Sequence, residues 1–149
     1  MNTAAASLYE QDFYRWLVEN ANLVRERRFA EIDVENIAEE LEAMGRSEKR
    51  ALINRLAVLL MHLLKWQFQA AKRSHSWKYT IKEQRRKVLK LLAESPSLQH
   101  ELQKRLAEAY DDAIFKAAKE TGFDQTKFPP HCPFSVEQVL DDNFWPDAA

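Results

Sequence analysis

Glycine and cysteine are scarce in this sequence, and their scarcity excludes several kinds of site. The 149 residues contain two glycines, Gly45 and Gly122, and one cysteine, Cys132. A dinucleotide-binding fingerprint or a phosphate-binding P-loop needs several glycines close together, because the backbone must approach the phosphates. A single cysteine excludes an internal disulfide framework and a cysteine-based zinc cluster. We therefore expect no cofactor and no metal site.

Long apolar runs and a strong net charge are also missing. The most apolar stretch, residues 56–64, contains His62 and is about half the roughly 20 residues that span a bilayer. Residues 1–12 lack the basic and apolar regions of a secretory signal. The formal net charge is -1, which by itself predicts no polyanionic partner. We expect a cytoplasmic protein that is not inserted in a membrane.

The residues that are present favour helices. There are 19 alanines and 17 leucines, against 16 valines, isoleucines and threonines together, and no alternating strand pattern is seen. Apolar residues at helical spacing predict an all-α fold, a compact bundle of about five main helices in one domain over residues 1–149. The expected helices cover about residues 8–27, 34–44, 47–72, 77–94 and 96–121.

Local signals predict where these helices begin and end. Ser7, Asp33, Ser76 and Ser135 are expected to cap helix starts, and Gly45 and Gly122 are expected to follow helix ends. The helix over 47–72 is apolar nearly all round at 56–64, which predicts a central, buried helix or a dimer seam. The tail, residues 123–149, is expected to run extended over the bundle, pinned by aromatic side chains, with a short helix after Ser135.

Several short motifs occur in an order typical of one family. They are ELEAMG at residues 40–45, HLLKWQ at 62–67, RSHSW at 73–77, SPSL at 95–98 and CPF at 132–134. In these motifs the chain resembles the bacterial domain of unknown function 29 family over nearly its full length. The resemblance implies a small, mainly helical bacterial protein, and it supplies no activity, ligand or catalytic residue.

Arg55 and His62 are the weak catalytic candidates. Seven residues are two helical turns, so both side chains point to the same side of one helix. A loosely similar spacing marks helical RNases, where an arginine and a histidine act on a phosphodiester. Leu56 stands where that motif usually has a polar residue. A surface arginine with an unrelated core histidine is the alternative interpretation.

The distribution of charge carries a clearer signal. Residues 65–90 hold nine basic side chains and one acidic one, so a nearly neutral chain contains a basic band. On a helical wheel Lys78, Lys82, Arg85 and Arg86 form one stripe, and Arg73 lies just before it. This stripe is a candidate contact for a polyanion or an acidic partner. The alternatives are that it complements the acidic helices of the same protein or is simply solvated.

These observations favour a non-enzymatic protein–protein interaction module. A homodimer and an unidentified protein partner are both open. Nucleic-acid binding through residues 72–90 is the alternative function, with RNase-like activity from Arg55 and His62 as its extension.

Overall fold

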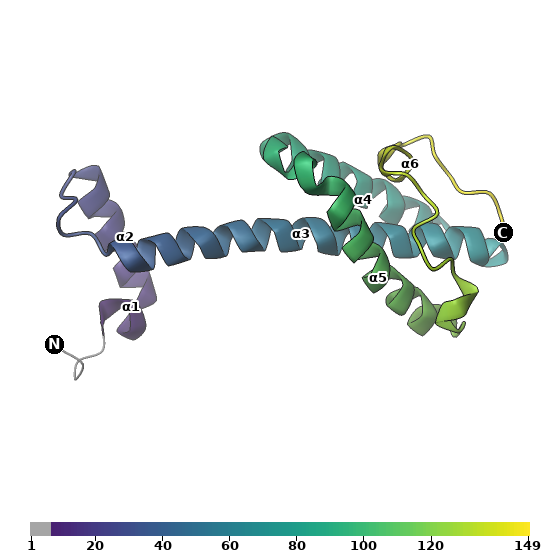
Figure 1. Cartoon of the computed structure of the whole chain (residues 1–149), viewed down its shortest axis with the longest axis horizontal. Coiled ribbons are helices and arrows are strands. Elements are labelled where there is room, and N and C mark those ends of the chain that lie inside the picture. The colour runs from purple at the N-terminus through teal and green to yellow at the C-terminus, as the bar shows by residue number, and fades with distance from the viewer. Residues whose placement is uncertain (1–6) are drawn as a thin grey trace. The chain divides into compact units, whose positions relative to one another are not determined.

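The computed structural model describes residues 7–149, and every regular element in that range is helical (Figure 1). The fold is therefore all-α, as the sequence predicts. No helix of the described range is long and apolar enough to cross a membrane. The elements are α1 (Leu8–Gln11), α2 (Phe13–Arg25), α3 (Val34–Phe68), η1 (Ala70–Lys72), α4 (His75–Glu94), η2 (Pro96–Glu101), α5 (Leu102–Thr121), η3 (Gln125–Lys127) and α6 (Val136–Leu140).

Contacts between residues group the chain into two compact units. The N-terminal unit ends at Arg46 and the C-terminal unit begins at Ser47, so the boundary falls within α3. Each unit is described by itself below. The single domain expected over residues 1–149 stays a prediction.

The N-terminal unit begins with two short helices where the sequence predicts one helix over residues 8–27. That prediction is wrong at Asp12, whose non-helical backbone, with φ -151° and ψ 85°, ends α1. The Asp12 carboxylate accepts a hydrogen bond from the backbone N–H of Arg15 at 3.1 Å and so caps α2. Aspartate at this position satisfies an amide that the new helix leaves unpaired. Ser7 caps α1 as expected, accepting from the N–H of Glu10.

Asp33 joins α2 to the start of α3. The Trp16 indole N–H donates to Asp33 Oδ2 at 2.8 Å, and the Asp33 backbone N–H donates to Asn20 Oδ1 at 2.9 Å. Asn36 also donates its side-chain N–H to Asp33 Oδ2 at 2.8 Å. Asp33 lies directly before α3, which confirms the predicted helix start there. Trp16 and Asn20 are the two buried residues of α2, so polar contacts hold these helices together.

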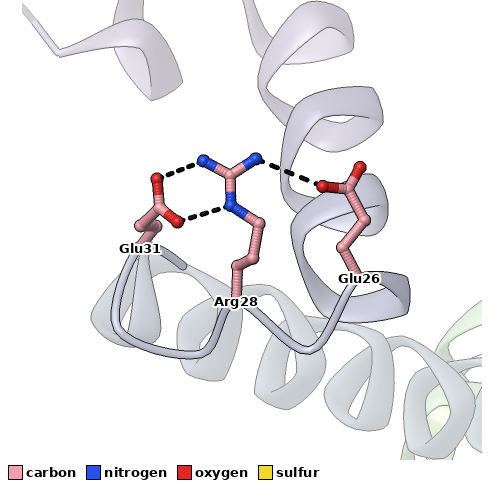
Figure 2. A network of polar contacts seen from close by, with 3 residues as sticks. All are labelled: Glu26, Arg28 and Glu31. Atoms are coloured by element: carbon pink, nitrogen blue, oxygen red, sulfur yellow. Dashed lines mark hydrogen bonds and ion pairs between the residues drawn. The ribbon is translucent and has the colours of Figure 1, made fainter.

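The turn between α2 and α3 is fixed by a small ionic network (Figure 2). The Arg28 guanidinium lies between two carboxylates, donating two hydrogen bonds to Glu31 and one to Glu26 at 3.2 Å. Such a two-pronged contact restricts the turn geometrically. These hydrogen bonds raise the pKa of Arg28 and lower the pKa of Glu31. Arg27 next to them adopts φ 58°, a left-handed conformation that lets the chain turn after α2.

Helix α3 runs without interruption through Gly45, where the sequence predicts a helix end. The two helices expected over 34–44 and 47–72 are thus one helix, and it ends at Phe68. Gly45 is not in the left-handed conformation that a helix-terminating glycine adopts. Strong helix formers flank it on both sides, and one glycine costs a helix only about 1 kcal/mol.

The core of the C-terminal unit is built around α3. Leu52, Leu56, Leu59, Leu60, Leu63 and Leu64 are all fully buried. This confirms that the stretch over 56–64 is buried nearly all round. Buried residues of α4, α5 and α6 join the same cluster, including Ile81, Leu106 and Val139. Figure 1 shows α4 and α5 beside the C-terminal part of α3.

The ends of α4 and α5 match the predicted signals only in part. The cap of α4 is Ser74, whose hydroxyl accepts from the Trp77 N–H at 3.1 Å, and not Ser76 as predicted. The chain over 96–101 is a 3-10 helix, so the α-helix expected from residue 96 begins at Leu102. Gly122 ends α5 at φ 77°, which confirms the predicted left-handed end.

The tail follows the predicted extended course and contains the predicted short helix, α6, together with one short 3-10 helix, η3, that was not predicted. Phe128 and Phe134 are buried, and Trp145 lies 4.8 Å from Trp66, measured between ring centroids. Ser135 forms the expected capping box with Gln138 at the start of α6. The backbone N–H of Ala149 donates to the Gln67 carbonyl at 2.9 Å. The tail is therefore attached to the C-terminal unit along its length.

Replacement of Gly45 and of Gly122 by alanine should change the stability of the protein in opposite directions. Gly45→Ala should stabilise the protein by about 0.5–1 kcal/mol, because alanine favours helix and an added Cβ meets no atom within 4 Å. Gly122→Ala should destabilise it by about 1 kcal/mol, because alanine strains at positive φ. Urea unfolding of both variants measures the difference. A loss of stability in Gly45→Ala would contradict a continuous α3.

Candidate functional site

An apolar groove lies in the N-terminal unit between α2 and α3. It encloses about 380 Å³ and is lined by Leu17, Ala21 and Val24 of α2 and by Ile37, Leu41 and Met44 of α3. Leu41 and Met44 are each 64% exposed, although both are apolar. Exposed apolar side chains gathered in one place mark binding surfaces far more often than scattered ones do. We call this feature the apolar groove.

Two charged residues of opposite sign also line the apolar groove. Arg25 lies in the last turn of α2 and Glu40 lies in α3. Arg25 donates a long hydrogen bond to Asn22 Oδ1 at 3.4 Å, and Glu40 accepts a hydrogen bond from the Tyr9 hydroxyl. Within the described residues neither Arg25 nor Glu40 is in an ion pair. The groove therefore has an unneutralised positive charge and an unneutralised negative charge on its walls.

Arg85 is not on an exposed stripe, which corrects the sequence prediction. Its side chain is fully buried. The guanidinium donates to the backbone carbonyls of Val139 and Phe144, both at 2.8 Å. Burial lowers the pKa of Arg85, while the charges of Asp142 and Asp141 raise it. Arg85 is thus a structural residue that holds the tail, and it is not available to a ligand.

Arg73 also contacts the tail and is partly withdrawn from solvent. Its Nε donates to the Trp66 carbonyl at 2.8 Å, and Nη2 donates to the Pro146 carbonyl at 3.3 Å. The guanidinium lies 4.9 Å from the centroid of the Trp66 ring. The helical wheel could not show this, because both contacts come from other parts of the chain.

Three residues of the predicted stripe, Lys78, Lys82 and Arg86, are exposed. Among the described residues none of the three pairs with a carboxylate. A second cleft, of about 490 Å³, is lined by Tyr79, Lys82, Arg86 and Leu89 of α4 and by Asp142 and Asn143 of the tail. We call it the cationic cleft. Lys65, in contrast, is buried in an ion pair with Glu120 at 3.0 Å, so one cation of the band does complement α5.

The cleft that Arg55 lines does not include His62. Both lie on α3, as predicted, but Arg55 lines a cleft of about 320 Å³ with Val58 and Gln84, and His62 is not part of its lining. His62 Nδ1 lies 2.9 Å from the Val58 carbonyl oxygen. Because a carbonyl only accepts, Nδ1 carries the proton in this contact. A catalytic role for the pair stays a hypothesis.

The surroundings of His62 favour its neutral form. Burial lowers its pKa, and the nearby Lys65 charge lowers it further, while the Val58 hydrogen bond and Glu120 act in the opposite direction. Burial also raises the pKa of the Cys132 thiol, whose Sγ donates to the Phe134 carbonyl at 3.4 Å. Cys132 is half-buried, and a protonated thiol is a poor nucleophile. Residues 7–149 contain no cluster of three or more histidine, cysteine, aspartate or glutamate side chains arranged to hold a metal ion.

The sequence pointed to part of each surface. Ile37, Leu41 and Met44 form a narrow apolar stripe in the sequence, but spacing alone does not show that the stripe is left uncovered. Asp142 and Asn143 carry no sequence signal that would place them opposite α4. Only the folded tail brings them to the cationic cleft.

The family profile described as Domain of unknown function DUF29 matches residues 8–145 of this chain. The chain belongs to this family. The residues that match DUF29 make up nearly the whole sequence and include most of both units and of the tail. The search of curated proteins and the search of solved structures each found no match. The description of DUF29 states no function.

Neighbouring arginines of α4 give a matched test of this geometry. Arg85→Ala should destabilise the protein by about 3 kcal/mol or more, because it leaves buried tail carbonyls without their charged donor. Arg86→Ala should change stability by less than about 1 kcal/mol, because Arg86 is exposed and unpaired. Thermal unfolding of both variants measures the difference. Equal effects would contradict the buried position of Arg85.

His62 should make stability depend on pH. In the unfolded chain histidine binds a proton near pH 6.5, whereas folding lowers the pKa of His62. The unfolded state therefore takes up the proton first as the pH falls, so this contribution is complete above about pH 6.5 and declines below it. His62→Gln should lose less free energy of unfolding than wild type between about pH 7.5 and about pH 5.5, as measured by urea titration. Identical losses would contradict the prediction.

Proposed function

We propose that this DUF29 protein is a non-enzymatic interaction module that docks a second copy of itself through the apolar groove. The observation that carries the proposal is the exposure of apolar side chains on both walls of one groove. Leu17 and Val24 are 41% and 44% exposed on α2, and Leu41 and Met44 are more exposed on α3.

The small size of the N-terminal unit supports the proposal that this surface binds a partner. Its described part is residues 7–46, and α2 buries only Trp16 and Asn20. Helical segments of about this size rarely bury enough apolar surface to be stable alone, and oligomerisation is a common remedy. The apolar side chains of α2 and α3 therefore favour a partner of similar apolar character.

The charges of the groove favour a second copy over a partner of one sign. Arg25 and Glu40 lie in the same groove and are free of ion pairs in the described part. In a two-fold dimer the same surface meets itself, so Arg25 of each copy can approach Glu40 of the other. The dimer then contains two Arg25–Glu40 ion pairs, one on each side of the two-fold axis.

The spacing on α3 also suits pairing of like helices. Val34, Ile37, Leu41 and Met44 follow one another at intervals of three, four and three residues. This is the spacing of side chains at a helix–helix seam. Of these, Val34, Leu41 and Met44 are exposed, which leaves the seam free for a second helix.

Self-association can be tested by sedimentation velocity on the full chain. Wild type should show a monomer–dimer equilibrium, and Leu41→Glu should weaken it at least about 10-fold, because it places a charge in an apolar contact. Tyr14→Glu is the matched control, because Tyr14 is 77% exposed and does not line the groove. A monomeric wild type, or a dimer insensitive to Leu41→Glu, would reject the proposal.

Charge reversal tests the two-fold arrangement itself. Arg25→Glu should weaken the dimer, because the new glutamate of each copy then faces Glu40 of the other copy and both attractions become repulsions. Combining Arg25→Glu with Glu40→Arg should restore much of the affinity, because the attraction is re-formed with reversed signs. A double variant weaker than both single variants would indicate that these residues do not meet.

Nucleic-acid binding through residues 72–90 is the second candidate function. The cationic cleft favours it, because Lys82 and Arg86 line a cleft and have no carboxylate partner in the described residues. The cleft at Arg55 gives no support to the extension to RNase activity, because His62 is not among its lining residues.

A further inference from the structure

The cationic cleft is formed by two segments that lie far apart in the sequence, so no single sequence motif specifies it. One wall is α4, which contributes Tyr79, Lys82, Arg86 and Leu89. The other wall is the tail, which contributes Asp142 and Asn143. The volume of about 490 Å³ is sufficient for a small ring system with attached groups.

The free cations of α4 are regularly spaced. Lys78, Lys82 and Arg86 follow one another every four residues, so their Cα atoms rise by about 6 Å per step along the helix. That separation is comparable to the distance between successive phosphates of an extended nucleic-acid strand. Elsewhere in the basic band, Lys65, Lys87 and Lys90 have carboxylate partners.

An aromatic ring lies beside this row. Tyr79 is 51% exposed, and its ring centroid lies 4.5 Å from that of His75. The Lys82 ammonium lies 5.9 Å from the centroid of the Tyr79 ring. An exposed aromatic ring next to cations is the combination that binds single strands, because bases stack on the ring and phosphates contact the cations.

The opposite wall is held in place by the protein. Arg85 donates to the carbonyls of Val139 and Phe144, which lie on either side of residues 141–143. The backbone N–H of Asn143 donates to Asp141 Oδ1 at 2.9 Å. The backbone of Asp142 and Asn143 is thus held beside α4, and their exposed carboxylate and amide can bond to the polar edge of a base.

We infer that the cationic cleft binds single-stranded nucleic acid. One base stacks on Tyr79 and meets Asp142 and Asn143 at its edge, while adjacent phosphates contact Lys78, Lys82 and Arg86. A duplex uses this cleft poorly, because its bases are stacked inside and cannot reach Tyr79. The inference rests on the second candidate function and is independent of self-association.

Fluorescence anisotropy with a labelled short oligouridylate tests the inference. Wild type should bind it at low salt, more tightly than it binds a duplex of equal length. The Lys82→Ala/Arg86→Ala variant should flatten the log–log salt dependence by about 1.4, because about 0.7 is lost per phosphate contact on a single strand. The control is Lys104→Ala/Lys116→Ala, which removes the same charge from exposed positions of α5.

Tyr79 separates stacking from general attraction. Tyr79→Ala should weaken binding by about 5-fold to 100-fold at constant salt slope, because it removes stacking and no charge. Tyr79→Phe should bind nearly as wild type, because the ring is kept. Leu41→Glu should bind oligouridylate as tightly as wild type does, because Leu41 lines the apolar groove and not the cationic cleft. This variant keeps the binding test independent of dimerisation.

The outcomes distinguish the inference from the candidate function. Equal binding of duplex and single strand, or loss of affinity in the α5 control as large as in the cleft variant, overturns the cleft as a single-strand site but leaves nucleic-acid binding. No binding of any oligonucleotide at low salt overturns both. A polyglutamate peptide that binds more tightly than oligouridylate of equal charge, and loses that affinity in Lys82→Ala/Arg86→Ala, assigns the cleft to acidic proteins and overturns the inference.

Discussion

The C-terminal unit depends on the hydrogen bonds that the buried Arg85 guanidinium donates to the tail. A fully buried charge is costly unless hydrogen bonds replace its water. Tail carbonyls supply these bonds to Nε and Nη2 of Arg85, whereas the buried Nη1 has no partner among the described residues. The contact joins α4 to α6 and to the segment before Trp145. It thereby fixes the course of a tail that prolines prevent from being one long helix.

The basic residues of residues 65–90 include one set that is bonded within the protein and another set that is exposed on α4. Arg85 and Arg73 bond to carbonyls of the tail, and Lys65 pairs with Glu120. Lys78, Lys82 and Arg86 remain exposed on α4. Because Arg85 positions the tail, it also places Asp142 and Asn143 opposite Lys82 and Arg86. A structural cation therefore builds one wall of the cleft in which two exposed cations lie.

The two units differ in how their apolar residues are used. In the C-terminal unit the leucines of α3 are fully buried under α4, α5 and α6. In the N-terminal unit hydrogen bonds to Asp33 hold α2 to α3, and Leu41 and Met44 of the apolar stripe of α3 stay exposed. The same kind of pattern, apolar residues at helical spacing, thus becomes a core in one unit and an open groove in the other.

The sequence by itself determined the all-α class, the start of α3 after Asp33, the capping box at Ser135 and the left-handed end at Gly122, because these follow from local propensities and backbone geometry. It misplaced the break at Gly45, where flanking helix formers outweigh one glycine, and it missed the break at Asp12. A helical wheel assigns a residue to a face, but what covers that face depends on distant segments. Only the tertiary structure therefore decided that Arg85 is buried while Arg86 is free, and that Leu41 and Met44 are exposed while Leu56 and Leu60 are not.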